Sequence, residues 1–144
     1  MLPRMRTPLP LFALTLCIGG GAASTSWAAP PSGCGITPNS TYVGRYFCAQ
    51  GWTDMTLSVV DVEGPRVRMQ GTFRHAGTGV QGAYLLRGFC FPTSRRMVLS
   101  PQAWVQQPPG YIMVGMSGLV SGEGQAFTGR MLHRSCGAFT FTRQ

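Results

Sequence analysis

Residues 104–119 read Trp-Val-Gln-Gln-Pro-Pro-Gly-Tyr-Ile-Met-Val-Gly-Met-Ser-Gly-Leu, and the pattern in this stretch organises the rest of the chain. Proline lacks a backbone N–H and glycine relieves φ restriction, so residues 108–110 predict a turn between two strands. After this turn apolar side chains alternate between two faces, which predicts a strand buried on at least one side. One face carries Ile112, Val114 and Met116, and the opposite face carries Tyr111 and Met113. Gly115 and Gly118 indicate a bend, a bulge or close approach of a neighbouring backbone.

Similar short segments rich in β-branched and aromatic residues occur along the whole chain from Thr41. Turn residues separate them, and no stretch has helical period after the N-terminal region. The segment that begins at Thr53 shows the clearest alternation, with one apolar face and one polar face. The predicted strands are 41–49, 53–62, 66–74, 80–91, 96–100, 111–119, 125–134 and 136–143.

This order of elements predicts an all-β antiparallel meander of about eight strands. A small up-and-down barrel is favoured because closure removes the two exposed edges of an open sheet. Gly82 and Gly88 lie in one row of the fourth segment and leave room for the curvature that closure requires. The alternative architecture is a two-sheet β-sandwich.

The N-terminal segment, 1–28, has the pattern of a cleaved signal peptide. Two arginines precede an apolar run at 9–18, and Ser26-Trp27-Ala28 offers small residues at the positions that a signal peptidase reads. Cleavage is expected after Ala28, since cleavage one residue later would place Pro30 beside the scissile bond. An uncleaved transmembrane anchor and a lipid-modified Cys17 fit this pattern less well. The chain therefore divides into a leader at 1–28, an extended segment at 29–40 and one barrel domain at 41–144.

Four cysteines remain after cleavage, an even number that predicts two disulfides in an exported chain. Three pairings are possible. A closed meander places its first strand beside its last, which would bring Cys48 to Cys136 and leave Cys34 for Cys90. No cysteine pair has the spacing of a zinc site, and neither a metal nor another cofactor is expected.

Arginine supplies every basic residue of the chain, and the formal net charge is +8. A cationic surface attracts polyanions without specifying which of them binds. The arginines are scattered along the sequence, so specific nucleic-acid binding is not expected. In the segment 66–74, however, Arg66, Arg68 and Arg74 share one face, and this face is the candidate surface for an anionic ligand.

The sequence shows no group of residues typical of an active site, and the protein is not expected to be an enzyme. Asp61 and Glu63 are the only acids close in sequence, and a solvated strand end explains them better than glycosidase chemistry does. His75 and His133 each lie near a predicted turn or strand end, where a catalytic triad would require an acid and a serine beside one of them, and Ser117 is not in a nucleophile elbow.

Aromatic residues give the strongest indication of binding, because Tyr and Trp rings pack well and still offer a hydrogen-bonding group. The set comprises Tyr42, Tyr46, Trp52, Tyr84, Trp104 and Tyr111. Most of these rings are expected in the core or at the ends of the barrel. The candidate ligand-binding residues are Trp104, Tyr111, Tyr84, Arg66, Arg68 and Arg74.

Three spaced motifs resemble an uncharacterised small β module of exported bacterial proteins. They are Gly44-x-Tyr46-x-Cys48-x-Gln50-Gly51, Trp104-x3-Pro108-Pro109-Gly110-Tyr111-x-Met113-Val114-Gly115 and Cys136-x2-Phe139. The resemblance covers residues 41–143 and supports pairing of Cys48 with Cys136. It implies no particular activity.

A weaker similarity is to the periplasmic barrel inhibitors of c-type lysozyme. It rests on Tyr46-x-Cys48, on Gly82-Ala83-Tyr84 and on Cys136. The inhibitory Thr-Lys-Gly loop of that family is absent here, and a basic chain would be repelled by a basic lysozyme.

Together these features predict a periplasmic or secreted, monomeric, non-catalytic binding protein of the bacterial envelope. Its partner would be a protein or an anionic envelope ligand. The alternatives are an inhibitor or immunity-type protein that acts against an envelope enzyme such as a lysozyme, and a structural envelope component.

Overall fold

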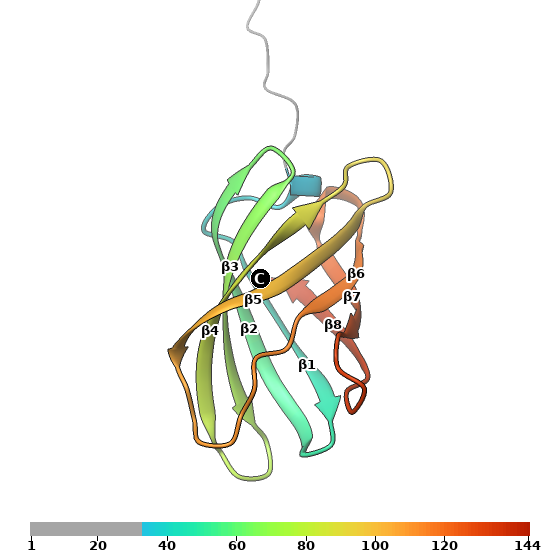
Figure 1. The fold of residues 1–144 in the computed structure, drawn as a ribbon. Coiled ribbons are helices and arrows are strands. Elements are labelled where there is room, and N and C mark those ends of the chain that lie inside the picture. The colour runs from blue at the N-terminus through green and yellow to red at the C-terminus, as the bar shows by residue number, and fades with distance from the viewer. Residues whose placement is uncertain (1–32) are drawn as a thin grey trace, which may run out of the picture.

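Eight antiparallel strands follow one another in the computed structural model, which describes residues 33–144. Each strand pairs with the next and β8 pairs with β1, so the sheet closes into a barrel (Figure 1). The predicted all-β meander and up-and-down barrel are confirmed, and the sandwich alternative is wrong. The strands are β1 (Thr41–Cys48), β2 (Gly51–Glu63), β3 (Arg66–His75), β4 (Gln81–Cys90), β5 (Arg96–Gln106), β6 (Met116–Val120), β7 (Ala126–Met131) and β8 (Ala138–Arg143).

The barrel interior is a packed core, because alternate residues of every strand point inward. On β2 the predicted apolar face is the buried face, and Asp54 and Ser58 lie outside. The rings of Phe127, Phe139 and Phe141 pack together where β7 meets β8. The largest fully buried side chains are Tyr42, Tyr84, Phe127, Phe141, Ile36, Met55, Leu57, Met69, Leu86, Met97, Leu99 and Met116.

Two glycines allow neighbouring strands to approach closely. A Cβ atom at Gly88 would overlap the carbonyl oxygen of Val98 on β5. A Cβ atom at Gly118 would overlap the carbonyl oxygen of Thr128 on β7. The close backbone approach predicted at Gly118 is therefore confirmed.

The prediction for residues 96–119 is wrong in its boundaries. Strand β5 does not end at Pro101 but continues to Gln106, because its register on β4 shifts twice. Proline is tolerated at such an irregularity, where its missing N–H interrupts no ladder. The predicted strand at 111–115 is instead part of a loop, residues 107–115, which we call the mouth loop. Its conformation follows tertiary contacts, including a buried Pro108 and a hydrogen bond from Tyr84 Oη to the Val114 carbonyl at 2.9 Å.

Both disulfides form as predicted, Cys34–Cys90 and Cys48–Cys136. The first ties the short 3-10 segment η1 (Gly33–Gly35) to the end of β4. The buried Ile36 side chain and the second 3-10 segment, η2 (Gly122–Gly124), complete the closure of this end of the barrel. Arg95 donates hydrogen bonds to the carbonyls of Cys34 and Val120, each at 2.8 Å. We call this end the capped end.

The predicted leader and the beginning of the extended segment, residues 1–32, lie outside the described residues. Within residues 33–144 no helix is long and apolar enough to cross a membrane.

Candidate functional site

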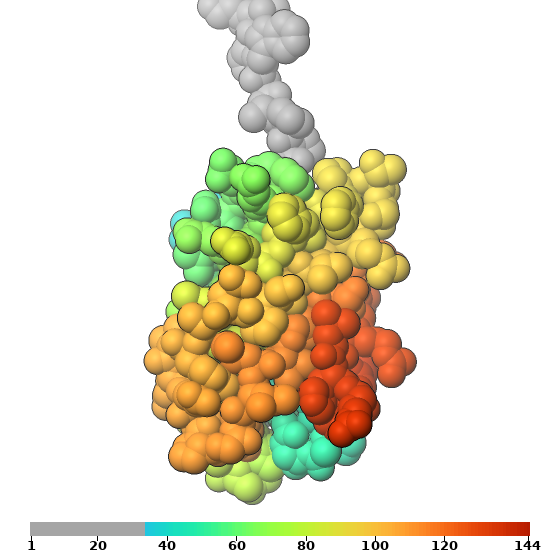
Figure 2. Space-filling view, in the orientation of Figure 1, coloured from blue at the N-terminus to red at the C-terminus, as the bar shows by residue number. Residues whose placement is uncertain are grey.

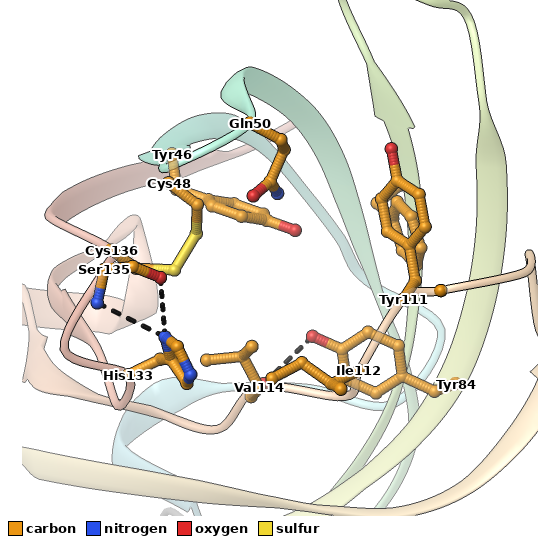
Figure 3. A pocket seen from close by; sticks show the side chains of 12 residues that line it. Tyr46, Cys48, Gln50, Tyr84, Tyr111, Ile112, Val114, His133, Ser135 and Cys136 are labelled. Carbon is orange, nitrogen blue, oxygen red and sulfur yellow. Dashed lines mark hydrogen bonds between the residues drawn. A yellow bond between two sulfur atoms is a disulfide. The ribbon is translucent and has the colours of Figure 1, made fainter.

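A pocket of about 240 Å³ lies at the end of the barrel opposite the capped end, which we call the mouth (Figure 3). The mouth loop forms one wall, and the segment between β7 and β8 forms another. The turn after β1 and the inward faces of β3 and β4 provide the rest. The lining residues are Tyr46, Cys48, Gln50, Phe73, Tyr84, Gly110, Tyr111, Ile112, Val114, His133, Ser135 and Cys136. None of these lining residues is an arginine, an aspartate or a glutamate.

Aromatic rings form one side of the pocket. Tyr111 stacks on Phe73 with ring centroids 5.6 Å apart and planes 23° apart. Trp104 stands behind this wall, with its ring centroid 5.5 Å from Tyr84 and 6.3 Å from Phe73. Trp104 itself is not a lining residue, so it supports the aromatic wall from behind.

The Tyr46 phenol lies on the opposite side of the pocket. Burial raises its pKa to about 12, an effect that the nearby Thr53 hydroxyl partly offsets and the Tyr111 phenol reinforces. Thr53 Oγ1 is fully buried and has no partner of normal hydrogen-bond geometry within residues 33–144. Burial also raises the pKa of Tyr84. Both phenols are therefore neutral hydrogen-bonding groups at physiological pH.

His133 contributes an oriented imidazole to the mouth. Ser135 offers its backbone N–H to His133 Nδ1 at 3.2 Å, and its hydroxyl lies 2.7 Å from the same nitrogen (Figure 3). Because Nδ1 accepts the backbone N–H, the hydrogen of the neutral ring is on Nε2. That N–H donor lies on the side of the ring away from Ser135. The Cys48–Cys136 disulfide adjoins this group and fixes the 132–137 segment to the end of β1.

Not all of the predicted ligand-binding residues come together. Tyr84 and Tyr111 line the mouth pocket, with Trp104 directly behind them. Arg66 and Arg68 lie at the β2–β3 turn, which is at the capped end. Most of the length of β3 separates them from the mouth.

Arg74 lies on the outer surface near the mouth and does not line the pocket. It is register partner of Asp54, whose carboxylate is already paired with Arg45 at 3.3 Å. The structure thus divides the predicted residues between two ends of the barrel. The single site that combined the aromatic loop with all three arginines does not form.

His75 and Asp61, which the sequence analysis considered for catalysis, are both held by contacts within the fold. His75 Nε2 donates to the Gln50 carbonyl at 2.6 Å, and Nδ1 lies 2.7 Å from Thr78 Oγ1, so the ring ties two turns together. Asp61 pairs with Arg68 at 3.5 Å on the outer surface. Among residues 33–144 no three His, Cys, Asp or Glu side chains are grouped as a metal would require.

Gln50 and Ser135 line the pocket although neither was predicted from the sequence as a ligand-binding residue. Both lie in turns that have no periodic pattern. Gln50 lies in the turn after β1, and Ser135 precedes Cys136, so each lies beside one half of the Cys48–Cys136 disulfide. Each residue is close in sequence to a cysteine of this disulfide. Once the pairing of Cys48 with Cys136 is predicted, that closeness alone places Gln50 and Ser135 at the same end of the barrel.

The raised phenol pKa values predict unfolding at alkaline pH. A raised pKa means that the folded state holds the proton more tightly than the unfolded state, where tyrosine titrates near 10. The free energy of unfolding is expected to stay level up to about pH 10 and to fall as the pH rises to about 12 and beyond. Urea unfolding curves at pH 8 to 12 would measure this. Tyr46→Phe should flatten the decline, and an equally steep decline in that variant would contradict the assignment.

No protein-family model, curated protein or solved structure matches this chain. The two resemblances seen in its sequence stay predictions.

Proposed function

We propose that this chain is an exported, non-catalytic binding protein whose ligand site is the mouth pocket. The ligand is small and uncharged, with one flat face and with hydroxyl or carbonyl groups at its edge. A single sugar ring or phenol has this chemistry. The observation that carries the proposal is the convergence of hydrogen-bonding groups, none of them permanently charged, on a pocket with an aromatic wall.

The composition of the pocket supports this class of ligand. Binding sites for small molecules combine apolar and aromatic walls with a few placed polar groups. Here Tyr111 offers a ring face, and Tyr46, Gln50, His133 and Ser135 offer the polar groups. An ionic ligand would find no permanently charged partner, because no Arg, Asp or Glu of the described chain lines the pocket. The volume lies just below the usual range for drug-sized ligands, about 300–1,000 Å³, which favours a small one.

Two observations support a location outside the cytosol. Structural disulfides persist in oxidising compartments, and the two disulfides within residues 33–144 join segments far apart in sequence. The N-terminal segment, 1–28, has the pattern of a leader for export. The periplasm or the extracellular space is therefore the proposed location.

A second candidate function is inhibition of an envelope enzyme, in which the mouth acts as a docking surface for a protein. Exposed apolar side chains at the rim favour it. Ile112 of the mouth loop is 61% exposed, and Phe47 and Trp52 pack edge-to-face on the outside of the adjoining hairpin. A structural envelope component, the third possibility, would need neither the pocket nor the rim.

The test is a screen of neutral monosaccharides and simple phenols against the isotope-labelled protein by NMR. We expect shifts confined to the amides of the mouth pocket. His133→Ala and Tyr111→Ala should each weaken the best ligand about tenfold, because each removes a placed polar or stacking group. Trp104→Ala should weaken it less, since Trp104 acts only through the wall.

Phe47→Ala is the matched control, as it removes an exposed ring near the mouth but outside the pocket. Ligand binding in this variant should equal that of the parent. Binding that survives His133→Ala and Tyr111→Ala would show that the pocket is not the site. Inhibition of an envelope muramidase by the protein, lost in Phe47→Ala and without uptake of any small ligand, would favour the second candidate.

A further inference from the structure

Four arginines and two phenylalanines lie together on the outside of the barrel near the capped end. We call this surface the basic aromatic face, and its residues are Arg66, Arg68, Arg87, Arg96, Phe89 and Phe91. The β2–β3 hairpin (green) and the β4–β5 hairpin (yellow) that carry it lie at the upper end of Figure 2. Arg87, Arg96 and the two phenylalanines were not among the predicted binding residues.

The strand registers bring these residues together. Arg66 is the partner of Phe89, and Arg68 is the partner of Arg87 across β3 and β4. At the end of the β4–β5 hairpin, the Phe91 N–H donates to the Arg96 carbonyl at 2.9 Å. A groove of about 610 Å³ runs over the β2–β4 part of this face.

The protein itself neutralises the arginines of this face only in part. Two like charges directly opposite each other destabilise a sheet, and Arg68 faces Arg87 in this way. Asp61 pairs with Arg68 at 3.5 Å, and Glu63 lines the same groove. Within residues 33–144, however, Arg66, Arg87 and Arg96 form no ion pair. The face therefore has an excess of positive charge that an external anion would neutralise.

A ligand that fits this face must also cover the two exposed phenylalanine rings with apolar groups. Phe89 and Phe91 are 45% and 51% exposed, and their rings stack with centroids 6.5 Å apart. Phe91 opens the loop at 91–95, which projects at the end of the barrel (Figure 1). A free phosphate or a soluble polyanion would pair with the arginines but leave these rings in water.

We propose that the basic aromatic face docks the protein on an anionic lipid bilayer. The four arginines contact headgroup phosphates, and Phe89 and Phe91 enter the interface between headgroups and acyl chains. Each arginine near such a surface strengthens binding about fivefold, because its interaction is worth about 1 kcal/mol. This site is at the opposite end of the barrel from the mouth pocket, so the pocket faces away from the membrane and stays open to solvent.

The test is sedimentation with vesicles of phosphatidylglycerol and phosphatidylcholine in equal amounts, and with vesicles of phosphatidylcholine alone. All proteins should have the same N-terminus, verified by intact mass, so that only the face differs. We expect binding to the anionic vesicles and little to the neutral ones. Arg66→Gln with Arg87→Gln should weaken binding about 25-fold. Phe89→Ser with Phe91→Ser should weaken it at least about tenfold.

Arg74→Gln with Arg134→Gln is the matched control, because it removes two exposed arginines away from this face. Binding of this control should stay within about threefold of the parent. Equal losses in the two arginine pairs would show that net charge alone attracts the protein, and would overturn the proposal. So would full binding by the phenylalanine variant, or equal binding to neutral vesicles. Circular dichroism of each variant excludes unfolding as the cause, and ligand binding at the mouth is measured separately and should not change.

Discussion

Replacement of Cys48 and Cys136 together by serine is expected to lower the free energy of unfolding by about 4–5 kcal/mol. The disulfide joins residues 88 apart in sequence. Its loss therefore raises the conformational entropy of the unfolded chain, which lowers the stability of the fold. It also releases the 132–137 segment from the end of β1, and that segment carries His133 and Ser135. Urea unfolding followed by tryptophan fluorescence would measure the stability, and NMR of the mouth amides would report on the pocket.

The other disulfide provides the matched comparison. Cys34 and Cys90 are 56 residues apart, and their double replacement by serine should cost a similar free energy, about 4 kcal/mol. It releases the capped end, however, and should leave the mouth amides unshifted. A loss below about 1 kcal/mol for the Cys48–Cys136 pair, or the same disturbance of the mouth in both variants, would contradict this account.

Phe127→Ala is expected to destabilise the barrel by about 3–5 kcal/mol. Phe127 is 1% exposed, and its ring lies 4.7 Å from Phe139 and 6.5 Å from Phe141, measured between centroids. Removal of the ring leaves a cavity in the barrel interior, and the hydrogen-bonded strands around it cannot move inward to fill it. Thermal and urea unfolding of the oxidised protein would give the loss in stability.

Leu119→Ala is the control for Phe127→Ala. Leu119 lies on the neighbouring strand β6, opposite Thr128, but it points outward and is 52% exposed. Its truncation should change the free energy of unfolding by no more than about 0.5 kcal/mol. If the two variants lose similar stability, the interior of the barrel is not the principal source of its stability.

Strict alternation made most of the strands predictable from the sequence. On β3, Val67, Met69 and Phe73 are buried while the arginines point outward, as their order in the sequence requires. Pairing of consecutive strands then followed from the short turns, and closure of the barrel brought Cys48 to Cys136. The disulfide pairing was thus a consequence of topology, and it is confirmed.

The mouth loop was not predictable in the same way. Its residues alternate like a strand, yet Ile112 is exposed and no ladder forms before Met116. The cause is a set of contacts from elsewhere in the chain, including the Tyr84 hydroxyl bound to the Val114 carbonyl. The local pattern of apolar residues cannot predict such contacts, because they form only after β4 and β5 have taken their places in the barrel.

The candidate sites were predictable only in part for the same reason. Tyr84 and Tyr111 were identified by residue type, but Gln50 and Ser135 lie in aperiodic turns that meet at the mouth only after closure. The arginines at 66 and 68 were found as one face of a strand. Their partners Arg87 and Phe89 lie on the neighbouring strand β4. The register between β3 and β4 cannot be predicted from the sequence of either strand alone.

The pairing of β8 with β1 determines when folding can finish. Tyr42 and Arg143 are register partners, so the ring stays open until almost all of the described chain has left the ribosome. Such contacts between distant residues form slowly. The edges of β1 and β8 therefore stay unpaired until late in folding, and during that time they can pair with another chain.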